Sequence, residues 1–287
     1  MVTLSRVARL RHVLARRQPS LTVCVDGVKK AHNLGAIARS AEAAGCLDVF
    51  AVAQDPKHVL LSNGNDIGKR KKARAQNAMK NDPAMESIDI DGDKNDSENV
   101  GWDVSNVGGP LRRVKNKELL ATSKGAHLWL QMSVHDQVDS AVKAIKARGM
   151  QIVTADLVPE SVDFREIDYT KPTCILVGAE AQGVSEEARR AADHIITIPM
   201  VGMVQSLNVS AATAVVLYEA QRQREIAGMY DPARSALSED EQNDLLVRFF
   251  QPDIAAFCDK RGIPYPLLDE HGSVIEDDAW LASIRSQ

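Results

Sequence analysis

The sequence predicts an α/β fold in which a parallel β-sheet is covered by helices on both faces. Short apolar runs alternate along the chain with longer segments of helical character, which is the order expected when each pair of parallel strands is joined by a helix. The helical segments also carry terminal signals, because glycine follows several of them and a serine precedes another. Both observations favour this fold class.

The strands and helices of this sheet follow one another in a regular order. The predicted strands are residues 21–25, 49–53, 151–155, 173–177 and 194–198, and the predicted helices are residues 33–44, 134–148, 185–192 and 210–224. Gly45 and Gly149 follow the first two helices, and glycine is a common C-terminal stop. Ser185 is predicted to cap the third helix, with Glu186 and Glu187 in its first turn.

Helical extensions are predicted at both ends, which divides the chain into residues 1–18, 19–230 and 231–287. Residues 1–18 form a basic helix, whose apolar positions repeat at helical spacing. Its arginines suit a solvated surface, a mitochondrial transit peptide or a helix that lies on nucleic-acid phosphates. In the last segment, Ser238 and Glu241 form a capping box for a helix over 238–250, and a short helix is predicted over 277–284.

Residues 63–121 interrupt the α/β pattern. The segment is basic at both ends, acidic from Asp82 to Asp103, and poor in apolar residues, so it is expected to be a flexible insertion. Its aspartates resemble part of a calcium loop, but the glycine and the final glutamate of an EF-hand are misplaced.

The net charge of −4 conceals an uneven distribution. Residues 82–103 and 231–287 each contribute −7, and residues 1–81 contribute +10. The basic first part of the chain is therefore compatible with an RNA partner. Aromatic residues make up only 4% of the chain, which argues against a binding surface made mainly of stacked rings.

Neither a metal site nor a membrane span is expected. The four cysteines, Cys24, Cys46, Cys174 and Cys258, form no C-x-x-C pair and are expected to be free thiols in a reducing cytosol. Residues 195–218 contain no charge and are long enough to cross a bilayer, but their Pro, Gly, Gln, Ser and Asn content suits lipid poorly.

Ligands of open parallel sheets bind beyond the carboxyl ends of the strands, and three such segments are distinctive. Gly178 and Gly183 frame a glycine-marked turn after strand 173–177, although it is neither a P-loop nor a dinucleotide fingerprint. Residues 199–210 offer apolar atoms and backbone amides that suit a neutral heterocycle. After strand 21–25, Asn33 is a candidate N-cap, and Arg39 is a lone cation that suits either a surface ion pair or a phosphate clamp.

These segments together resemble the SpoU/TrmH branch of the SPOUT methyltransferases. The likeness lies in residues 33–41 (NLGAIARSA), 175–184 (ILVGAEAQGV) and 198–212, from IPM to SLNVSAA, in the order and spacing of the family. Further likeness lies in residues 15–19, 163–169, 218–224 and 228–230. The resemblance covers about 1–62 and 122–287, whereas the insertion departs from the family pattern.

The resemblance implies a SPOUT fold with a deep C-terminal trefoil knot, a cytoplasmic homodimer and S-adenosylmethionine bound at the knot. The residues that match the family's catalytic positions are Arg39, Asn33, Glu180, Ser206 and Asn208. Those expected at the cofactor are Thr154, Ala155, Leu157, Gly178, Glu180, Gly183, Ile198, Met203, Ser206 and Leu207. Those expected to contact RNA are Arg6, Arg9, Arg11, Arg16, Arg17, Arg222 and Arg224.

The activity that the resemblance implies is 2′-O-methylation of a tRNA ribose, with the D-loop guanosine at position 18 as the expected target. No metal is required. Because arginine is normally protonated, Arg39 suits pairing with an RNA phosphate that relays the hydroxyl proton better than direct action as a base. The alternatives are another tRNA ribose, a ribosomal RNA ribose, or an RNA-binding protein that has lost catalysis.

Overall fold

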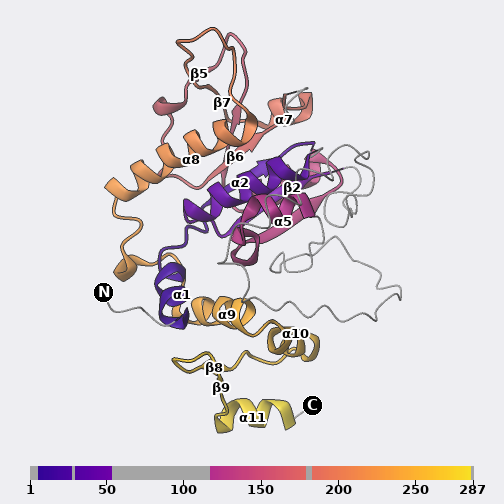
Figure 1. Ribbon diagram of the computed structural model, residues 1–287, viewed down its shortest axis with the longest axis vertical. Coiled ribbons are helices and arrows are strands. Elements are labelled where there is room, and N and C mark those ends of the chain that lie inside the picture. Colours follow the sequence, from indigo (N-terminus) through magenta and orange to yellow (C-terminus); the bar gives the residue numbers. More distant parts are fainter. Residues whose placement is uncertain (1–5, 28–29, 54–116, 179–182, 286–287) are drawn as a thin grey trace, which may run out of the picture.

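The computed structural model describes residues 6–27, 30–53, 117–178 and 183–285. Its centre is a seven-stranded sheet of order β3-β2-β1-β6-β4-β7-β5, in which every neighbouring pair is parallel (Figure 1). The strands are β1 (Leu21–Val25), β2 (Asp48–Val52), β3 (Gln131–His135), β4 (Gln151–Ala155), β5 (Val162–Asp163), β6 (Thr173–Val177) and β7 (His194–Thr197). The predicted α/β fold with a parallel sheet is confirmed.

Helices cover both faces of this sheet. On one face, α2 (Ala31–Ala43), α5 (Lys117–Ser123) and α8 (Val209–Ile226) bury apolar side chains against β1, β2 and β6. On the other face, α6 (Val138–Ala147) and α7 (Glu186–Ala191) pack on the alternate residues of the same strands. The central strands are buried on both sides, which explains why their sequences are apolar throughout.

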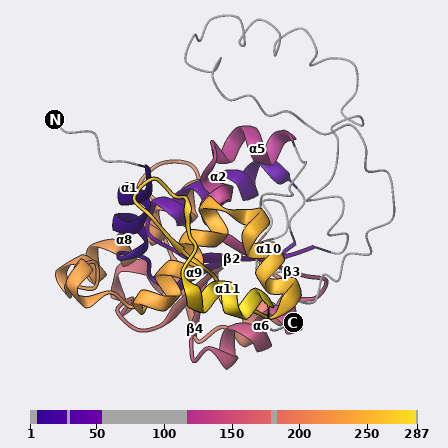
Figure 2. The same ribbon diagram turned by 90° about the horizontal axis from the view of Figure 1, so that it is seen from below.

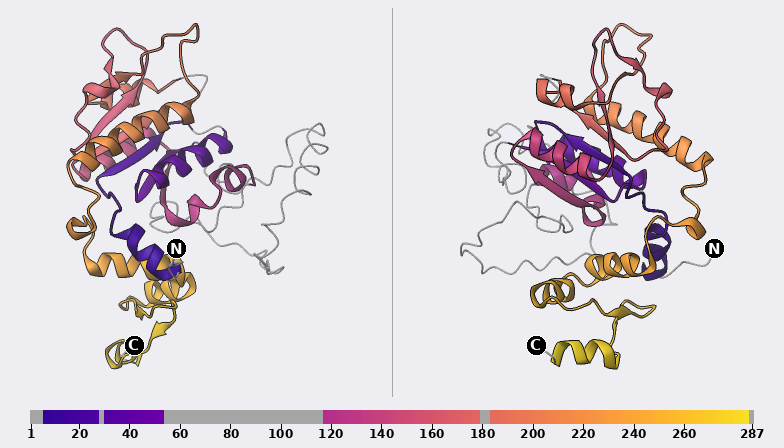
Figure 3. Two further views of the ribbon diagram at one scale, coloured as in Figure 1. Left: turned by 60° about the vertical axis from the view of Figure 1, so that its left-hand side comes forward. Right: turned by 180° about the vertical axis from the view of Figure 1, so that it is seen from behind.

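The two ends of the chain form a third apolar core beside the sheet domain. Helix α1 (Arg6–Leu14) packs against α9 (Glu239–Phe250), and α9 also packs against α10 (Pro252–Arg261) and β8 (Leu267–Leu268). Strand β8 pairs with β9 (Val274–Ile275), and apolar side chains of all five elements belong to one core. Helix α11 (Asp278–Arg285) ends the described chain. Figures 1 and 3 show these elements gathered at one end of the molecule, away from α7 and β5, and Figure 2 shows them in front of the sheet domain when the molecule is seen from that end.

Several element boundaries differ from the sequence prediction. Residues 134–148 are not one helix, because Gln131–His135 is the edge strand β3 and the helix begins only at Val138. In β3, Met132 and Val134 are buried while the other three residues are half-buried, an alternation too short to distinguish from the start of a helix. Helices α5 and α10 and the strands β5, β8 and β9 were not predicted.

The predicted insertion at 63–121 is shorter at its end than the sequence suggests. Residues 117–121 belong to α5, whose Leu119 is fully buried against α2. A Cβ added at Gly35 would lie 2.7 Å from the Leu119 carbonyl oxygen, so glycine allows the two helices to approach closely. Residues 63–116, which include the acidic stretch, lie outside the described residues.

Candidate functional site

The candidate site lies at the carboxyl ends of β6, β4 and β7, which are neighbours in the sheet (Figure 1). Because the strands are parallel, the segments that follow Val177, Ala155 and Thr197 all leave from the same edge. The segments that contain the residues expected at the cofactor therefore start from one end of the sheet.

The segment after β6 begins and ends on glycine. A Cβ added at Gly178 would lie 1.9 Å from the carbonyl oxygen of Gly183 and 2.3 Å from the backbone nitrogen of Val184, so only glycine lets the two ends touch. Gly183 has a positive φ of 66°, which also favours glycine. Glu180, expected at both the catalytic and the cofactor positions, lies outside the described residues.

The segment after β4 is held by an ion pair that sequence reasoning did not find. The Asp156 carboxylate accepts hydrogen bonds from the backbone nitrogen of Leu157 (2.9 Å) and from Arg189 Nε of α7 (2.7 Å). Leu157 is 60% exposed, whereas Ala155 is half-buried. The side chain of Thr154, a residue expected at the cofactor, is fully buried, and its hydroxyl donates to the Leu176 carbonyl oxygen at 3.0 Å.

The segment after β7 presents apolar side chains to solvent. Ile198 packs partly against the core, whereas Met203 is fully exposed and Leu207 is 37% exposed. Ser206 is exposed as well. Asn208 ends the segment as the N-cap of α8, and its side-chain oxygen accepts a hydrogen bond from the backbone nitrogen of Ser210 at 2.9 Å.

Arg39 and Asn33 lie on α2, which packs against α8. Arg39 is exposed, and among the described residues its guanidinium forms no hydrogen bond or ion pair. Asn33 is not the N-cap that the sequence suggested, because the helix begins at Ala31 and Lys30 occupies the cap position. Asn33 lies instead within the first turn, where it is only 8% exposed.

The seven arginines expected to contact RNA fall into two groups. Those that are exposed and accessible to a nucleic acid are Arg6, Arg9, Arg11, Arg16 and Arg222. The prediction of RNA contact is wrong for Arg17 and Arg224, because their side chains are buried, at 1% and 0% exposure.

Arg17 anchors the end of α2. Its guanidinium pairs with the Glu42 carboxylate at 3.0 Å and donates to the carbonyl oxygens of Glu42 (3.1 Å), Cys46 (2.8 Å) and Trp129 (3.0 Å). Burial lowers the pKa of Arg17, and the adjacent Glu42 opposes this shift. An arginine with these partners stabilises the protein and is not available to a phosphate.

Arg224 anchors the end of α8. Its guanidinium donates to the carbonyl oxygens of Ser20, Tyr169 and Lys171 at 2.8–3.0 Å, and also to Gln18 Oε1 (3.1 Å) and Ser20 Oγ (2.9 Å). Burial lowers its pKa. The helix that begins after Asn208 is therefore fastened at its far end to the amino-terminal side of the sheet.

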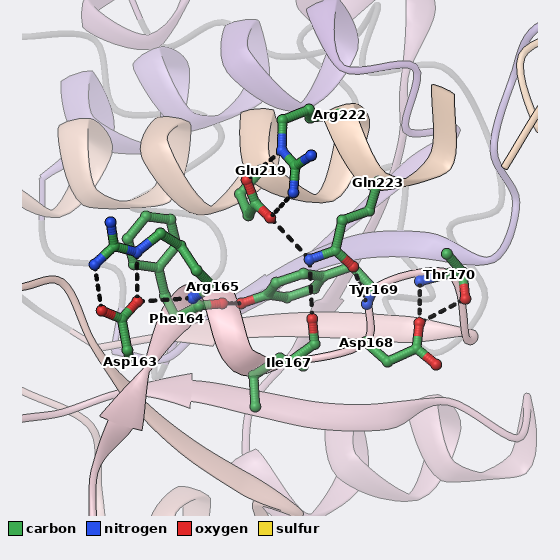
Figure 4. A network of polar contacts seen from close by, with 10 residues as sticks. All are labelled: Asp163, Phe164, Arg165, Ile167, Asp168, Tyr169, Thr170, Glu219, Arg222 and Gln223. Atoms are coloured by element: carbon green, nitrogen blue, oxygen red, sulfur yellow. Dashed lines mark hydrogen bonds and ion pairs between the residues drawn. The ribbon is translucent and has the colours of Figure 1, made fainter. Parts of the chain in front are cut away.

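A second polar network fastens the last turns of α8 to the segment between β5 and β6 (Figure 4). Gln223 accepts a hydrogen bond from the Tyr169 backbone nitrogen (2.9 Å) and donates to the Ile167 carbonyl oxygen (3.0 Å). Glu219 pairs with Arg222 at 2.8 Å and accepts from Gln223 at 2.8 Å. These contacts bind the segment 163–169, which resembles the family in sequence, to α8.

Neither a metal site nor a membrane span is found in the parts of the chain that the structure describes. No group of three or more His, Cys, Asp or Glu side chains is arranged to hold a metal ion there. No helix among those residues is long and apolar enough to cross a membrane. All four cysteines are buried free thiols, and burial raises the pKa of Cys46 to about 12.

Comparisons with known proteins cover nearly the whole chain. The SpoU rRNA Methylase family matches residues 97–218, and the SpoU, rRNA methylase, C-terminal family matches residues 222–277. The tRNA (guanosine(18)-2′-O)-methyltransferase of Escherichia coli is 37% identical over 98% of both chains. The protein of that name from Thermus thermophilus is 39% identical over 81% of this chain and 90% of its own.

A solved structure agrees with these sequence matches. The crystal structure of the Aquifex aeolicus TrmH/SpoU tRNA modifying enzyme superposes with a TM-score of 0.60 at 36% identity. The superposition covers 87% of this chain and 96% of that one. The similarity therefore extends from the sequence motifs to the arrangement of the strands and helices.

Proposed function

This chain belongs to the SpoU methylase family, and from that premise we propose that it methylates the ribose 2′-hydroxyl of guanosine 18 in tRNA, with S-adenosylmethionine as methyl donor. The observation that carries the proposal is the 37% identity with the Escherichia coli tRNA (guanosine(18)-2′-O)-methyltransferase over 98% of both chains. An alignment of that extent includes the terminal helices as well as the sheet, so it covers the parts that would select the RNA.

The residues at the sheet edge suit the methyl donor. Leu157, Met203 and Leu207 are exposed apolar side chains in segments of irregular backbone, where free amide and carbonyl groups are also available. A heterocycle such as adenine needs both features, namely apolar contact with its faces and hydrogen bonds at its edge. When bound, S-adenosylmethionine would supply a methyl group on a positively charged sulfur, which leaves readily as a neutral thioether when the methyl group is transferred.

The chain must then position the ribose hydroxyl and remove its proton. Arg39 is exposed and has no partner among the described residues, so it is free to hold an RNA phosphate beside the reacting hydroxyl. A guanidinium stays protonated, which favours a role in fixing a phosphate that takes up the proton over a role as the base itself. This geometry would be supported by Asn33, which lies on the same helix as Arg39, and by Ser206 and Asn208.

Exposed arginines would bind the phosphates of the rest of the tRNA. Arg9 and Arg16 form no ion pair within the part of the chain described, whereas Arg222 is paired with Glu219 and would exchange that partner for a phosphate. Arg6 lies over the rings of Trp129 (5.8 Å) and Phe250 (5.5 Å). Its position therefore links the basic helix to the carboxyl-terminal core.

A homodimer is part of the proposal. Tyr218 and Val215 on α8 are 53% and 38% exposed, and Val201 and Val204 after β7 are exposed at 103% and 61%. Apolar side chains gathered on one helix and the loop that precedes it are typical of an interaction surface. Replacing Tyr218 with Asp should shift the protein towards monomer in sedimentation experiments, whereas Phe257→Asp, at an apolar side chain of α10 that is 38% exposed, should not. A monomeric wild type would contradict the dimer.

The cytoplasm, where tRNA is modified, is the proposed location. The deep trefoil knot implied by the family resemblance remains a prediction.

The activity is tested with unmodified tRNA transcript, radiolabelled S-adenosylmethionine and full-length protein. The wild type should transfer label to tRNA, and Arg39→Ala should lower kcat at least a hundredfold while the Kd for S-adenosylmethionine in the absence of tRNA stays within twofold. Arg16→Ala serves as the matched control, because it removes an exposed arginine outside α2 and should raise KM for tRNA with little change in kcat. Equal loss of kcat in both variants would contradict the role of Arg39, and transfer to ribosomal RNA fragments alone would contradict the tRNA target.

A further inference from the structure

Asp26 fastens both ends of the turn that follows β6. Its backbone nitrogen donates to the Val177 carbonyl oxygen at 2.8 Å, directly before the turn. Its carboxylate oxygen Oδ2 accepts a hydrogen bond from the Ser185 backbone nitrogen at 2.8 Å, directly after the turn. Asp26 is 6% exposed, so both bonds lie in a protected environment, where an unpaired polar group is costly.

The ends that Asp26 joins are also packed against each other. Gly178 contacts the backbone of Gly183 and Val184 so closely that a Cβ at Gly178 would overlap the Gly183 carbonyl carbon at 2.0 Å. Hydrogen bonds to Asp26 lie on either side of this contact. The base of the turn is thus a closed neck, held from the neighbouring strand β1.

The carboxyl side of the neck is fixed a second time through α7. Ser185 caps this helix, because its hydroxyl accepts a hydrogen bond from the Ala188 backbone nitrogen at 3.2 Å. One residue further along α7, Arg189 pairs with Asp156 at 2.7 Å, and Asp156 belongs to the segment after β4. The segments after β4 and β6 are therefore held in one arrangement with Asp26.

Asp26 also leads into the helix that carries Arg39. It directly follows β1, Gly27 after it has a positive φ of 67°, and α2 begins at Ala31. Asp26 therefore lies in the segment of the chain that joins β1 to α2.

We propose that Asp26 is a positioning residue for methyl transfer, which holds Gly178 and Gly183, at the two ends of the turn after β6, beside the end of β1. The proposal rests on the proposed function, because it assigns that turn to the methyl donor. Asp26 touches neither donor nor RNA in this role. Its carboxylate acts through the Ser185 backbone nitrogen, and replacing it would loosen the neck at that end while the backbone bond to Val177 remains.

The test compares Asp26→Ala and Asp26→Asn with a matched control in the full-length protein. Asp193 provides the control, because its carboxylate also accepts a backbone hydrogen bond, from Ile152 nitrogen at 2.6 Å, at the amino end of β4. Calorimetry gives the Kd for S-adenosylmethionine without RNA, steady-state assays give kcat and KM for tRNA, and thermal unfolding gives Tm for every variant.

Asp26→Ala is expected to raise the Kd for S-adenosylmethionine roughly ten- to a hundredfold, as the loss of a buried charge-assisted hydrogen bond would, and to lower kcat with KM for tRNA unchanged. Asp26→Asn should recover part of both losses, since its amide oxygen can still accept from Ser185 nitrogen. Asp193→Ala should lower Tm with no change in Kd. The proposal is overturned if Asp26→Ala leaves Kd and kcat unchanged, or if Asp193→Ala raises Kd equally.

Failure of the proposed function gives a different result. If the wild type binds S-adenosylmethionine but methylates no tRNA, the tRNA target is wrong, and the Kd values of the Asp26 and Asp193 variants still decide the positioning role.

Discussion

Replacing Arg224 with Met should destabilise the protein strongly without acting on RNA directly. The fully buried guanidinium donates five hydrogen bonds, to the carbonyl oxygens of Ser20, Tyr169 and Lys171 and to the side chains of Gln18 and Ser20. Methionine fills a similar volume but donates no hydrogen bond, so all five bonds would be lost, and those to the Tyr169 carbonyl oxygen and Gln18 Oε1 would be lost in buried surroundings.

The size of the effect follows from these partners. A hydrogen bond to a charged group contributes about 1.5–3 kcal/mol, but five such bonds do not add, because removing the cation also removes the cost of burying it. Breaking a buried charged network costs about 3–5 kcal/mol. Since 1 kcal/mol corresponds to roughly 2–4 °C in proteins of about this size, the Tm of Arg224→Met should fall by about 10 °C.

Arg222 is the matched control, two residues away on the same helix. Its side chain is 60% exposed and its partner is Glu219, so Arg222→Met should leave Tm near that of the wild type. Filter binding below the lowest Tm should show weaker tRNA binding for Arg222→Met, with a log–log salt slope reduced by about 1. Arg224→Met should keep the wild-type slope. A variant Arg224→Met that retains its Tm and loses salt slope would refute the structural role of Arg224.

Three further predictions follow from the same structure. Gly178→Ala should abolish S-adenosylmethionine binding in calorimetry, because the added Cβ would overlap Gly183. Gly202→Ala should bind normally, because a Cβ added at Gly202 would have no atom within 4 Å. Equal affinities of the two variants would contradict the closed neck. Arg17→Met should lower Tm by several degrees in thermal unfolding, and an unchanged Tm would show that its buried bonds contribute little. Burial lowers the pKa of His127, so near and below pH ~6.5 the unfolded state binds more protons than the folded state. The free energy of unfolding measured with urea should therefore decrease as the pH is lowered through this range, and His127→Gln should flatten that dependence.

Local sequence signals were sufficient for most of the sheet. The strands Leu21–Val25, Gln151–Ala155 and Thr173–Val177 have the predicted bounds, and the predicted caps Ser185 and Ser238 are both present. These features depend on neighbouring residues, so a linear pattern can reveal them. The edge strand β3 was missed because only Met132 and Val134 are buried in it.

Features that depend on distant parts of the chain were not predictable. Arg222 and Arg224 belong to one sequence motif, yet only the second is buried, because its partners Gln18 and Ser20 lie more than 200 residues away. Asp26 and Ser185, separated by 159 residues, show the same limit. Burial of Arg17 likewise arises from contact with Glu42 and Trp129, and no local pattern distinguishes it from an exposed arginine.

The measurement that tests the central claim most directly is the mapping of 2′-O-methylated riboses in a tRNA transcript after incubation with the wild-type protein and S-adenosylmethionine. We predict a single new methyl group, on the 2′-oxygen of guanosine 18, and none after incubation with Arg39→Ala. A methyl group on a different ribose, or an unmodified guanosine 18 after incubation with active wild-type protein, would contradict the proposed function.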